Sequence, residues 1–168
     1  MSVDYEASVA DVHGAFLEED YWRARLVDSG TDIAELESLR IGGKSGKDGT
    51  VDVVTMQAVH SHNLPALVTQ LHRGDLCVRR EEAWGPVVDG VATATISGCV
   101  VNAPVSLSGT ALLGPIEESG GARLKFQATI HVRVPIIGGK LEKIIGGHLA
   151  DLMVMEQRFT TTWIAGSA

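Results

Sequence analysis

The sequence predicts an α+β fold in which a curved antiparallel sheet of seven strands wraps around one long C-terminal helix. Nearly every run before residue 134 alternates apolar and polar residues with period two, which is typical of antiparallel strands that bury one face. The last thirty or so residues instead repeat apolar residues at steps of three or four: Leu141, Ile145, Leu149, Leu152, Met155, Phe159 and Trp163. A helical stripe of this length needs a broad apolar partner, so we expect it to be buried against the concave face of the sheet.

The length of the chain suits one structural unit. Its 168 residues and 17.8 kDa can form a substantial core but are too few to expect two domains. No internal repeat divides it, and the glycine-rich stretch 42–49 has the size of a hairpin loop. We therefore expect residues 1–168 to form a single domain.

Two short helices are expected directly after the first strand. That strand covers 3–7, and Ser8 then stands at a helix N-cap position, with Asp11 near the positive end of the helix dipole. The first helix should begin at about Val9. A second helix follows through 21–26 and is ended by Ser29 and Gly30.

Six further strands and one short helix complete the expected order before the last helix. The helix is expected at 64–71, where Pro65 stands at a first helical turn and apolar residues follow at helical spacing. The strands are separated by turn-rich segments and are expected at 34–41, 50–59, 76–84, 91–101, 105–114 and 122–134.

The last of these strands has the clearest assignment of faces. Its apolar side chains point to one side of the sheet and its polar ones, such as Arg123 and Lys125, to the other, which should face water. The apolar set is Leu124, Phe126, Ala128, Ile130, Val132 and Val134.

Two adjacent glycines interrupt the final helix, which we expect to span 134–165. Gly146 and Gly147 lie in its interior, where each costs about 1 kcal/mol relative to alanine. Something must favour the missing side chains. Either the helix touches a strand closely at this point, or it leaves room for a ligand.

The charge and the N-terminus exclude several classes of partner. The formal net charge of −7 opposes non-specific attraction to nucleic acid and to an anionic membrane surface. Residues 1–5 lack the basic start of a targeting segment, and no run approaches the ~18 apolar residues of a membrane-spanning helix. We therefore expect a cytoplasmic protein with no nucleic-acid partner and no stable membrane insertion. Its oligomeric state is left open by the sequence.

The residues that carry metal and nucleophile chemistry are scattered. The six histidines form no HExxH motif or close pair with an acid, so we expect no metal and no cofactor, and we expect most of them at the surface. Cys77 and Cys99 stand on separate strands without CxxC spacing, which suits two reduced core thiols better than a metal site or a redox pair, and a disulfide between them is not expected. No serine lies in a G-x-S-x-G elbow or beside a base.

Five segments of the chain resemble a known family. They are 16–25 (FLEEDYWRAR), Gly85-Pro86, Gly109-Thr110-Ala111, 134–142 (VPIIGGKLE) and Gln157-Arg158-Phe159-Thr160. Together they resemble the actinobacterial DUF2505 family, and the element order resembles the helix-grip fold of the START-like superfamily, which includes the Bet v 1 allergens and the polyketide cyclases. The resemblance implies a deep apolar cavity between sheet and helix that holds lipids, steroids or polyketides. It implies no particular reaction.

Charged residues on one strand are candidates for a polar contact inside such a cavity. Arg79, Arg80, Glu81 and Glu82 follow one another in the strand 76–84, so one arginine and one glutamate must face each side of the sheet. A buried pair could fix the polar end of a ligand, whereas a pair in solvent would only bridge neighbouring strands. His148, after the two helix glycines, is a candidate polar anchor at the cavity rim, although it suits a flanking position better.

Three functions are consistent with these patterns. The first is the carriage of a small hydrophobic, lipid-like or polyketide-like ligand without catalysis. The second is an enzyme of the cyclase or aromatase type, with Glu82, Arg80 or His148 assisting proton transfer. The third is a protein-interaction module with a filled core, whose partner surface would be an apolar patch at 64–71. The expected ligand-binding residues are Arg80, Glu82, Leu124, Phe126, Ile130, Ile145, His148, Leu149, Leu152 and Met153.

Overall fold

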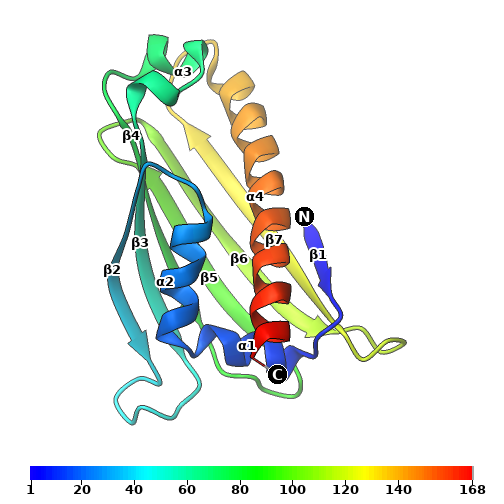
Figure 1. The fold of residues 1–168 in the computed structure, drawn as a ribbon. Helices are drawn as coiled ribbons and strands as arrows, with labels where there is room; N and C mark the ends of the chain where they lie inside the picture. Colours follow the sequence, from blue (N-terminus) through cyan, green and yellow to red (C-terminus); the bar gives the residue numbers. More distant parts are fainter. Residues whose placement is uncertain (168) are drawn as a thin grey trace.

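In a computed structural model, the chain forms an open antiparallel sheet of seven strands crossed by a long C-terminal helix (Figure 1). The structure describes residues 1–167, with the side chains of all of these except Leu67 and Leu71. The elements in chain order are β1 (Ser2–Tyr5), α1 (Val9–Phe16), α2 (Glu19–Asp28), β2 (Ile33–Ile41), β3 (Val51–Val59), η1 (Ser61–Asn63), α3 (Ala66–Leu71), β4 (Leu76–Trp84), β5 (Ala92–Val100), β6 (Val105–Pro115), β7 (Ala122–Val132) and α4 (Gly138–Gly166). The predicted fold class and element order are confirmed.

The strands lie in the order β1-β7-β6-β5-β4-β3-β2, so the first and second strands of the chain form the two edges. Consecutive strands from β2 to β7 pair as antiparallel neighbours, and β1 joins β7 at the far edge. The edge strand β2 changes register between Leu36 and Ser38, a bulge of the kind that discourages pairing with another sheet edge.

Local signals place the first helix where the sequence predicted it. Ser8 adopts an extended conformation, and its hydroxyl oxygen accepts a hydrogen bond of 3.2 Å from the backbone N–H of Asp11. This bond satisfies one of the unpaired N–H groups at the start of α1. The helix begins at Val9 as expected.

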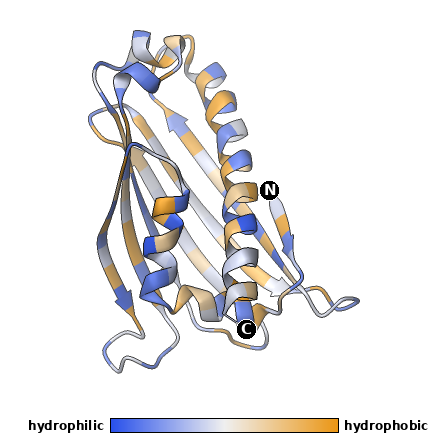
Figure 2. Ribbon diagram, viewed as in Figure 1, coloured by the Kyte–Doolittle hydropathy of each residue, from blue (hydrophilic) through white to orange (hydrophobic). Residues whose placement is uncertain are grey.

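The concave face of the sheet is divided into two ends. Near α1 and α2 it is closed by a buried apolar cluster that includes Phe16, Tyr21, Trp22, Trp84 and Leu113. Toward α3 and the start of α4, the inward apolar side chains of the same strands, such as Leu107 and Ile130, are only half-buried. Figure 2 shows apolar residues alternating with polar ones along these strands. The core is therefore concentrated at one end of the molecule.

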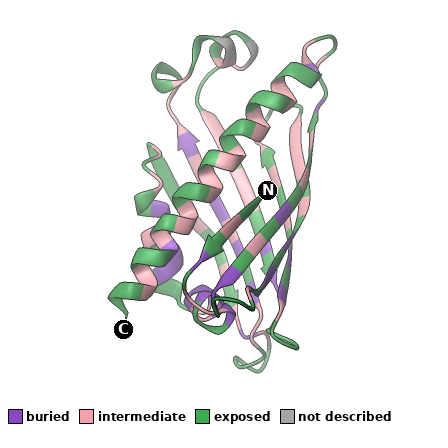
Figure 3. Ribbon diagram, turned by 90° about the vertical axis from the view of Figure 1, so that its right-hand side faces the viewer, coloured by how far each residue is buried: buried purple, intermediate pink, exposed green. Residues whose placement is uncertain are grey.

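Helix α4 differs from its prediction in two respects. It begins at Gly138 and not at 134, because Pro135 disfavours helical backbone at Val134 and Ile136 has a positive φ of 72°. Its inner face was predicted to be buried, yet among the residues described in α4 only Gly138 and Thr160 are buried. Figure 3 shows the helix as intermediate and exposed along almost its whole length. The reason is that α4 packs on β7, β1, α1 and α2, at one side and one end of the sheet.

Cys77 and Cys99 are free thiols, but the prediction that they lie in the core is wrong, because Cys77 is half-buried and Cys99 is exposed. No helix in the described part of the chain is long and apolar enough to cross a membrane.

Candidate functional site

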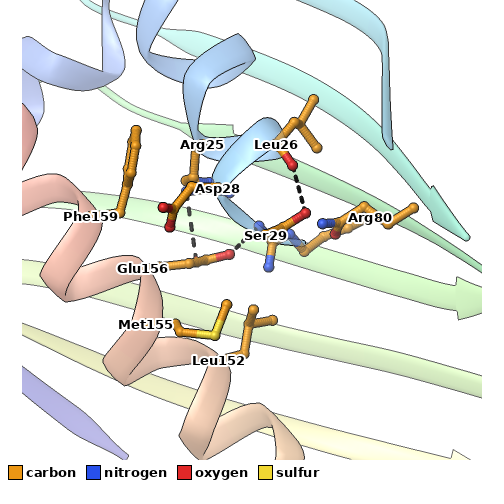
Figure 4. Close-up of a pocket in the computed structure, with 10 residues that line it drawn as sticks. Arg25, Leu26, Asp28, Ser29, Arg80, Leu152, Met155, Glu156 and Phe159 are labelled. Carbon is orange, nitrogen blue, oxygen red and sulfur yellow. Dashed lines mark hydrogen bonds and ion pairs between the residues drawn. The ribbon is translucent and has the colours of Figure 1, made fainter. Parts of the chain in front are cut away.

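Four charged side chains from three elements meet between the sheet and α4. Arg25 of α2 donates a hydrogen bond from Nη2 to Glu82 Oε1 on β4 at 2.9 Å. Arg80 of β4 donates from Nη2 to Glu156 Oε1 on α4 at 2.7 Å. Arg25 Nη1 lies 3.7 Å from Glu156 Oε2, and Arg80 Nε lies 3.0 Å from Glu82 Oε1. We call these four residues the charge quartet; Figure 4 shows three of them.

Strand alternation explains which side chains of β4 enter the quartet. Arg80 lies opposite Thr55 and Gly98, and Glu82 lies opposite Val53 and Ile96, all on the concave face. Arg79 faces the outside, where it pairs with Glu37 at 2.9 Å and Glu81 at 2.7 Å. The alternative that the sequence left open is thereby resolved: Arg80 and Glu82 point inward.

The neighbours of Glu82 and Arg25 favour the charged forms of these two groups. Burial by itself would raise the pKa of Glu82, but Arg25 and Arg80 overcome this effect and lower it to about 2. Burial likewise opposes the charge on Arg25, yet Glu156 and Glu82 raise the pKa of Arg25 well above its ordinary value. Two cations and two anions therefore balance within the site, which carries no net charge of its own.

Aromatic and hydroxyl groups surround the buried side of the quartet. The Arg25 guanidinium lies 4.4 Å from the ring centroid of Trp22, within cation–π range. Trp84 Nε1 donates to Glu82 Oε2 at 3.4 Å. Behind them the Tyr21 and Thr160 hydroxyls lie 2.7 Å apart, and Thr160 donates to the backbone oxygen of Glu156 at 2.8 Å. These contacts fix the orientation of the charged groups.

A small pocket opens beside the quartet. Its volume of about 10 Å³ is roughly the space that one water molecule requires. Figure 4 shows the end of α2 on one side of it and the side chains of α4 on the other. The lining residues are Arg25, Leu26, Asp28, Ser29, Gln57, Arg80, Leu152, Met155, Glu156 and Phe159. Arg80 Nε is buried here and donates no hydrogen bond, because its contact with Glu82 is close but poorly aligned.

A larger hollow lies elsewhere, on the outer face of the sheet. It has a volume of about 370 Å³ and is lined by residues such as Val91, Leu112, Ile116, Arg123 and Lys125. The side chains of Leu112, Arg123 and Lys125 belong to the face of β6 and β7 opposite the quartet. None of the predicted ligand-binding residues lines it.

The predicted apolar residues fall into two groups. Phe126 belongs to the buried cluster, and Leu124 and Met153 pack against it. Ile130, Ile145, Leu149 and Leu152 are half-buried and, within the described side chains, belong neither to that cluster nor to the residues packed against it. We call these four the apolar wall; they line the inner side of β7 and α4.

His148 does not join these residues. Its side chain is exposed at the edge of the apolar stripe on α4. Of the two positions considered from the sequence, the cavity rim and the flank of the helix, the structure therefore places His148 on the flank. His13 departs from the expectation that most histidines lie at the surface, because it is buried and its Nε2 lies 3.0 Å from the backbone oxygen of Gly85. In the described part of the chain, no three His, Cys, Asp or Glu side chains come together as a possible metal site.

The helix glycines leave space on both sides of α4. A Cβ atom added at Gly146 would meet Ile130 Cδ1 at 3.9 Å, an ordinary van der Waals contact, and one added at Gly147 would meet nothing within 4 Å. On the facing sheet, a Cβ at Gly98 would meet just the backbone oxygen of Arg79 at 3.4 Å. Close packing of helix on strand therefore does not explain these glycines, and the room beside Gly146 adjoins the apolar wall.

Sequence reasoning missed half of the quartet. The sequence predicts a helix around Arg25 but no site role for it, and it does not distinguish Glu156 as a site residue by any motif. The position of Glu156 does indicate an inward side chain, since it lies four residues after Leu152 and four before Thr160 on the same face of the helix. A charged residue at the centre of an apolar helical stripe calls for a buried partner.

Comparisons with known proteins extend across the chain. The model of the family described as "Protein of unknown function (DUF2505)" matches residues 1–164. Uncharacterised proteins of Mycobacterium tuberculosis and Mycobacterium bovis are 64% identical over 167 residues, covering 99% of this chain and 96% of theirs.

Two solved structures have the same fold at low sequence identity. A STAR-related lipid transfer protein from Xanthomonas axonopodis aligns with a TM-score of 0.51 at 14% identity, over 93% of this chain and 83% of its own. Ara h 8.0201, a protein of the Bet v 1 type, aligns with a TM-score of 0.50 at 12% identity, over 96% of this chain and 95% of its own. Their likeness establishes the START-like helix-grip fold. On the evidence of the family match and the mycobacterial relatives, the chain belongs to the DUF2505 family.

Proposed function

We propose that this protein binds a small hydrophobic molecule between the sheet and α4 and carries it without chemical change. The observation that carries the proposal is the apolar wall, Ile130, Ile145, Leu149 and Leu152, which stays half-exposed on the inner side of the fold. Each square ångström of apolar surface left in water costs ~25 cal/mol relative to burial. A ligand that covered this wall would recover that free energy.

The charge quartet supports a ligand with an uncharged polar end. It lies next to Leu152, so a molecule on the apolar wall would bring one end close to Arg80 and Glu156. Both arginines already have carboxylate partners, so a ligand carboxylate would add an unbalanced charge to a largely buried site. A hydroxyl or carbonyl group in the pocket could accept a hydrogen bond from the Arg80 guanidinium, and a hydroxyl could also donate to Glu156, without that cost.

The quartet is poorly suited to proton transfer, which disfavours the cyclase or aromatase alternative. A general base works best with a pKa near the operating pH, whereas that of Glu82 is lowered to about 2. An arginine guanidinium stays protonated in proteins, so Arg80 cannot take up a proton. His148, the third candidate, is exposed at the edge of the helix stripe.

The interaction-module alternative is disfavoured by the glycines. A filled core would require Gly146 and Gly147 as close-packing devices, yet a Cβ atom added at either position would meet no atom outside the helix backbone closer than 3.9 Å, so close packing does not require a glycine there. The patch at 64–71 that this alternative needs lies partly outside the described residues, since it includes the side chains of Leu67 and Leu71. Leu64 is half-buried, and Pro65 and Ala66 are exposed.

The fold comparisons add a weaker support. The name of the Xanthomonas protein describes lipid transfer, which favours a similar use of the interior here by analogy of fold alone. At 14% identity the likeness does not extend to a particular ligand.

The test is native mass spectrometry of the protein purified from its own host, followed by thermal shifts with paired ligands. Hexadecanol and palmitate share a chain length and differ in the charge of the head group. We expect a retained hydrophobic molecule, and a larger rise of the melting temperature with hexadecanol. A clean apo mass with no shift from any lipid would refute carriage, and a preference for palmitate would refute the uncharged head group.

A further inference from the structure

The connection between β7 and α4 contains an isoleucine in an unfavourable state. Ile136 has a φ of 72°, a left-handed conformation that β-branched residues rarely adopt. Its side chain is also fully exposed, at 103% of its reference surface. Asparagine or glycine would satisfy this backbone better, and any polar residue would suit the exposure better.

Among the described residues, Ile136 gains no contact that would offset these two costs. The neighbouring backbone bonds run from Ile137 N to the Pro135 oxygen at 2.8 Å and from Gly138 N to the Val134 oxygen at 3.1 Å, and they require no particular side chain at 136. Strained residues tend to persist where the strain is part of a function. An apolar side chain held out in water therefore points to a partner outside the molecule.

Exposed basic residues precede and follow Ile136 in the sequence, although the chain as a whole is acidic. Arg133, Lys140 and Lys143 are all exposed, and Ile144 adds a second partly exposed apolar side chain at 38%. No aspartate or glutamate occurs from 119 to 141. The next acid, Glu142, is half-buried and accepts a hydrogen bond from the Val132 N–H at 3.2 Å. We call Arg133, Ile136, Lys140, Lys143 and Ile144 the basic corner.

We propose that the basic corner docks this protein, peripherally and reversibly, on an anionic lipid membrane. The three cations would lie at the level of the lipid phosphates, and Ile136 would enter the boundary between head groups and acyl chains. An exposed apolar residue between basic residues of the chain fits a bilayer better than nucleic acid, which offers no apolar layer to receive it. The net charge of −7 opposes attraction of the whole molecule, so the interaction requires this local reversal of sign.

The position of the corner makes docking useful for a carrier. α4 begins at the end of the molecule where α3 lies, away from the buried cluster (Figure 1). Ile145 of the apolar wall directly follows Ile144 of the corner, and Leu149 lies about one helical turn further along α4. A protein docked in this way would bring the half-buried apolar wall close to the lipid. The docking inference does not depend on the proposed cargo.

The experiment is vesicle flotation of the full chain with phosphatidylcholine vesicles and with vesicles that also contain phosphatidylglycerol. We expect binding to the anionic vesicles alone, weakened by salt. Lys140→Gln/Lys143→Gln should reduce the binding by about tenfold or more. Ile136→Asn should reduce it comparably while leaving the melting temperature unchanged or higher, because asparagine tolerates the positive φ.

Two control variants match these changes elsewhere on the surface. Val27→Asn removes another exposed aliphatic side chain, 82% accessible on α2, and Lys44→Gln/Lys47→Gln removes two exposed lysines of the 42–50 loop. Neither should alter flotation. Absence of binding to anionic vesicles overturns the proposal. Loss of binding in the lysine variant together with full binding by Ile136→Asn also overturns the proposal. That result would mean that the lysines attract anionic surfaces in general and that Ile136 does not enter the bilayer.

Discussion

Arg25 of α2 and Glu82 of β4 lie 2.9 Å apart in the buried interior, although 57 residues separate them in the chain. Arg80 also contacts Glu82, and it forms an ion pair with Glu156 of α4. The charge quartet thus connects α2, the central strand β4 and the C-terminal helix α4.

Removing Arg25 should destabilise the fold strongly. Arg25→Met keeps much of the apolar stem but leaves two buried carboxylates with fewer partners, so the free energy of unfolding should fall by about 3 kcal/mol. Urea denaturation measures this quantity. Arg23→Met on the same helix is the matched control, because Arg23 forms an exposed pair with Glu19, with 60% and 57% of their side chains accessible. It should cost less than about 0.5 kcal/mol, and equal losses for the two variants would contradict a buried role for Arg25.

The Glu82 carboxylate should give stability a distinct dependence on pH. Its folded pKa, lowered to about 2, lies below its ordinary value of 4.5, so the folded state binds the proton more weakly than the unfolded state. The resulting stability is fully present above about pH 4.5 and is lost as the pH falls toward 2.

Glu82→Gln isolates this contribution from those of other carboxylates. The variant should be less stable than the wild type at pH 7, and the difference should shrink as the pH falls below about 4.5. Urea unfolding at a series of pH values measures both proteins. Glu117→Gln, at an exposed loop residue, serves as the control with no such trend. A difference that stays constant from pH 7 to 3 would show that Glu82 is not held ionised by the arginines.

The hydroxyl contact between Tyr21 and Thr160 should contribute measurably to stability. Tyr21→Phe removes a 2.7 Å hydrogen bond in a buried site and should cost about 1 kcal/mol. Thr160→Val should cost more, because it also removes the bond to the Glu156 backbone oxygen. A double-mutant cycle should show coupling of about 1 kcal/mol between the two hydroxyls. Strict additivity would mean that the bond does not form in solution.

Filling the space beside the apolar wall should separate stability from ligand binding. Gly146→Leu directs a side chain toward Ile130, whose Cδ1 would lie 3.9 Å from the new Cβ, and Gly147→Leu directs one toward solvent. Both should stabilise the helix by up to about 1 kcal/mol through propensity. In the hexadecanol thermal shift, the Gly146 variant alone should lose the response. Equal responses from the two variants would place the ligand elsewhere.

Much of the fold could be predicted because its signals are local and periodic. β4 spans 76–84 as expected, and α1 begins one residue after its Ser8 cap. The start of α4 was misjudged because apolar residues continue through Pro135, Ile136 and Ile137, and a pattern of hydrophobicity does not report a left-handed residue. Backbone conformation of this kind depends on how the chain leaves β7.

The site was less accessible to sequence reasoning. Arg80 and Glu82 could be proposed from alternation, but which of the two pairs on β4 faces inward depends on strand register. The ion pairs that Arg25 and Glu156 form with Glu82 and Arg80 could not be predicted from the sequence, because they depend on how α2 and α4 cross the sheet. The same applies to the apolar face of α4, whose partial exposure depends on where the sheet curves away.

The concentration of the core at one end also has a dynamic consequence. Local opening of a segment costs free energy in proportion to what it buries, and the first half of α4 buries little among its described residues. Its amide hydrogens should therefore exchange with solvent through small fluctuations, while those of β3 and β6 beside the buried cluster exchange only when the whole chain unfolds. Hydrogen–deuterium exchange would then show a molecule that stays folded at one end while the other opens and recloses.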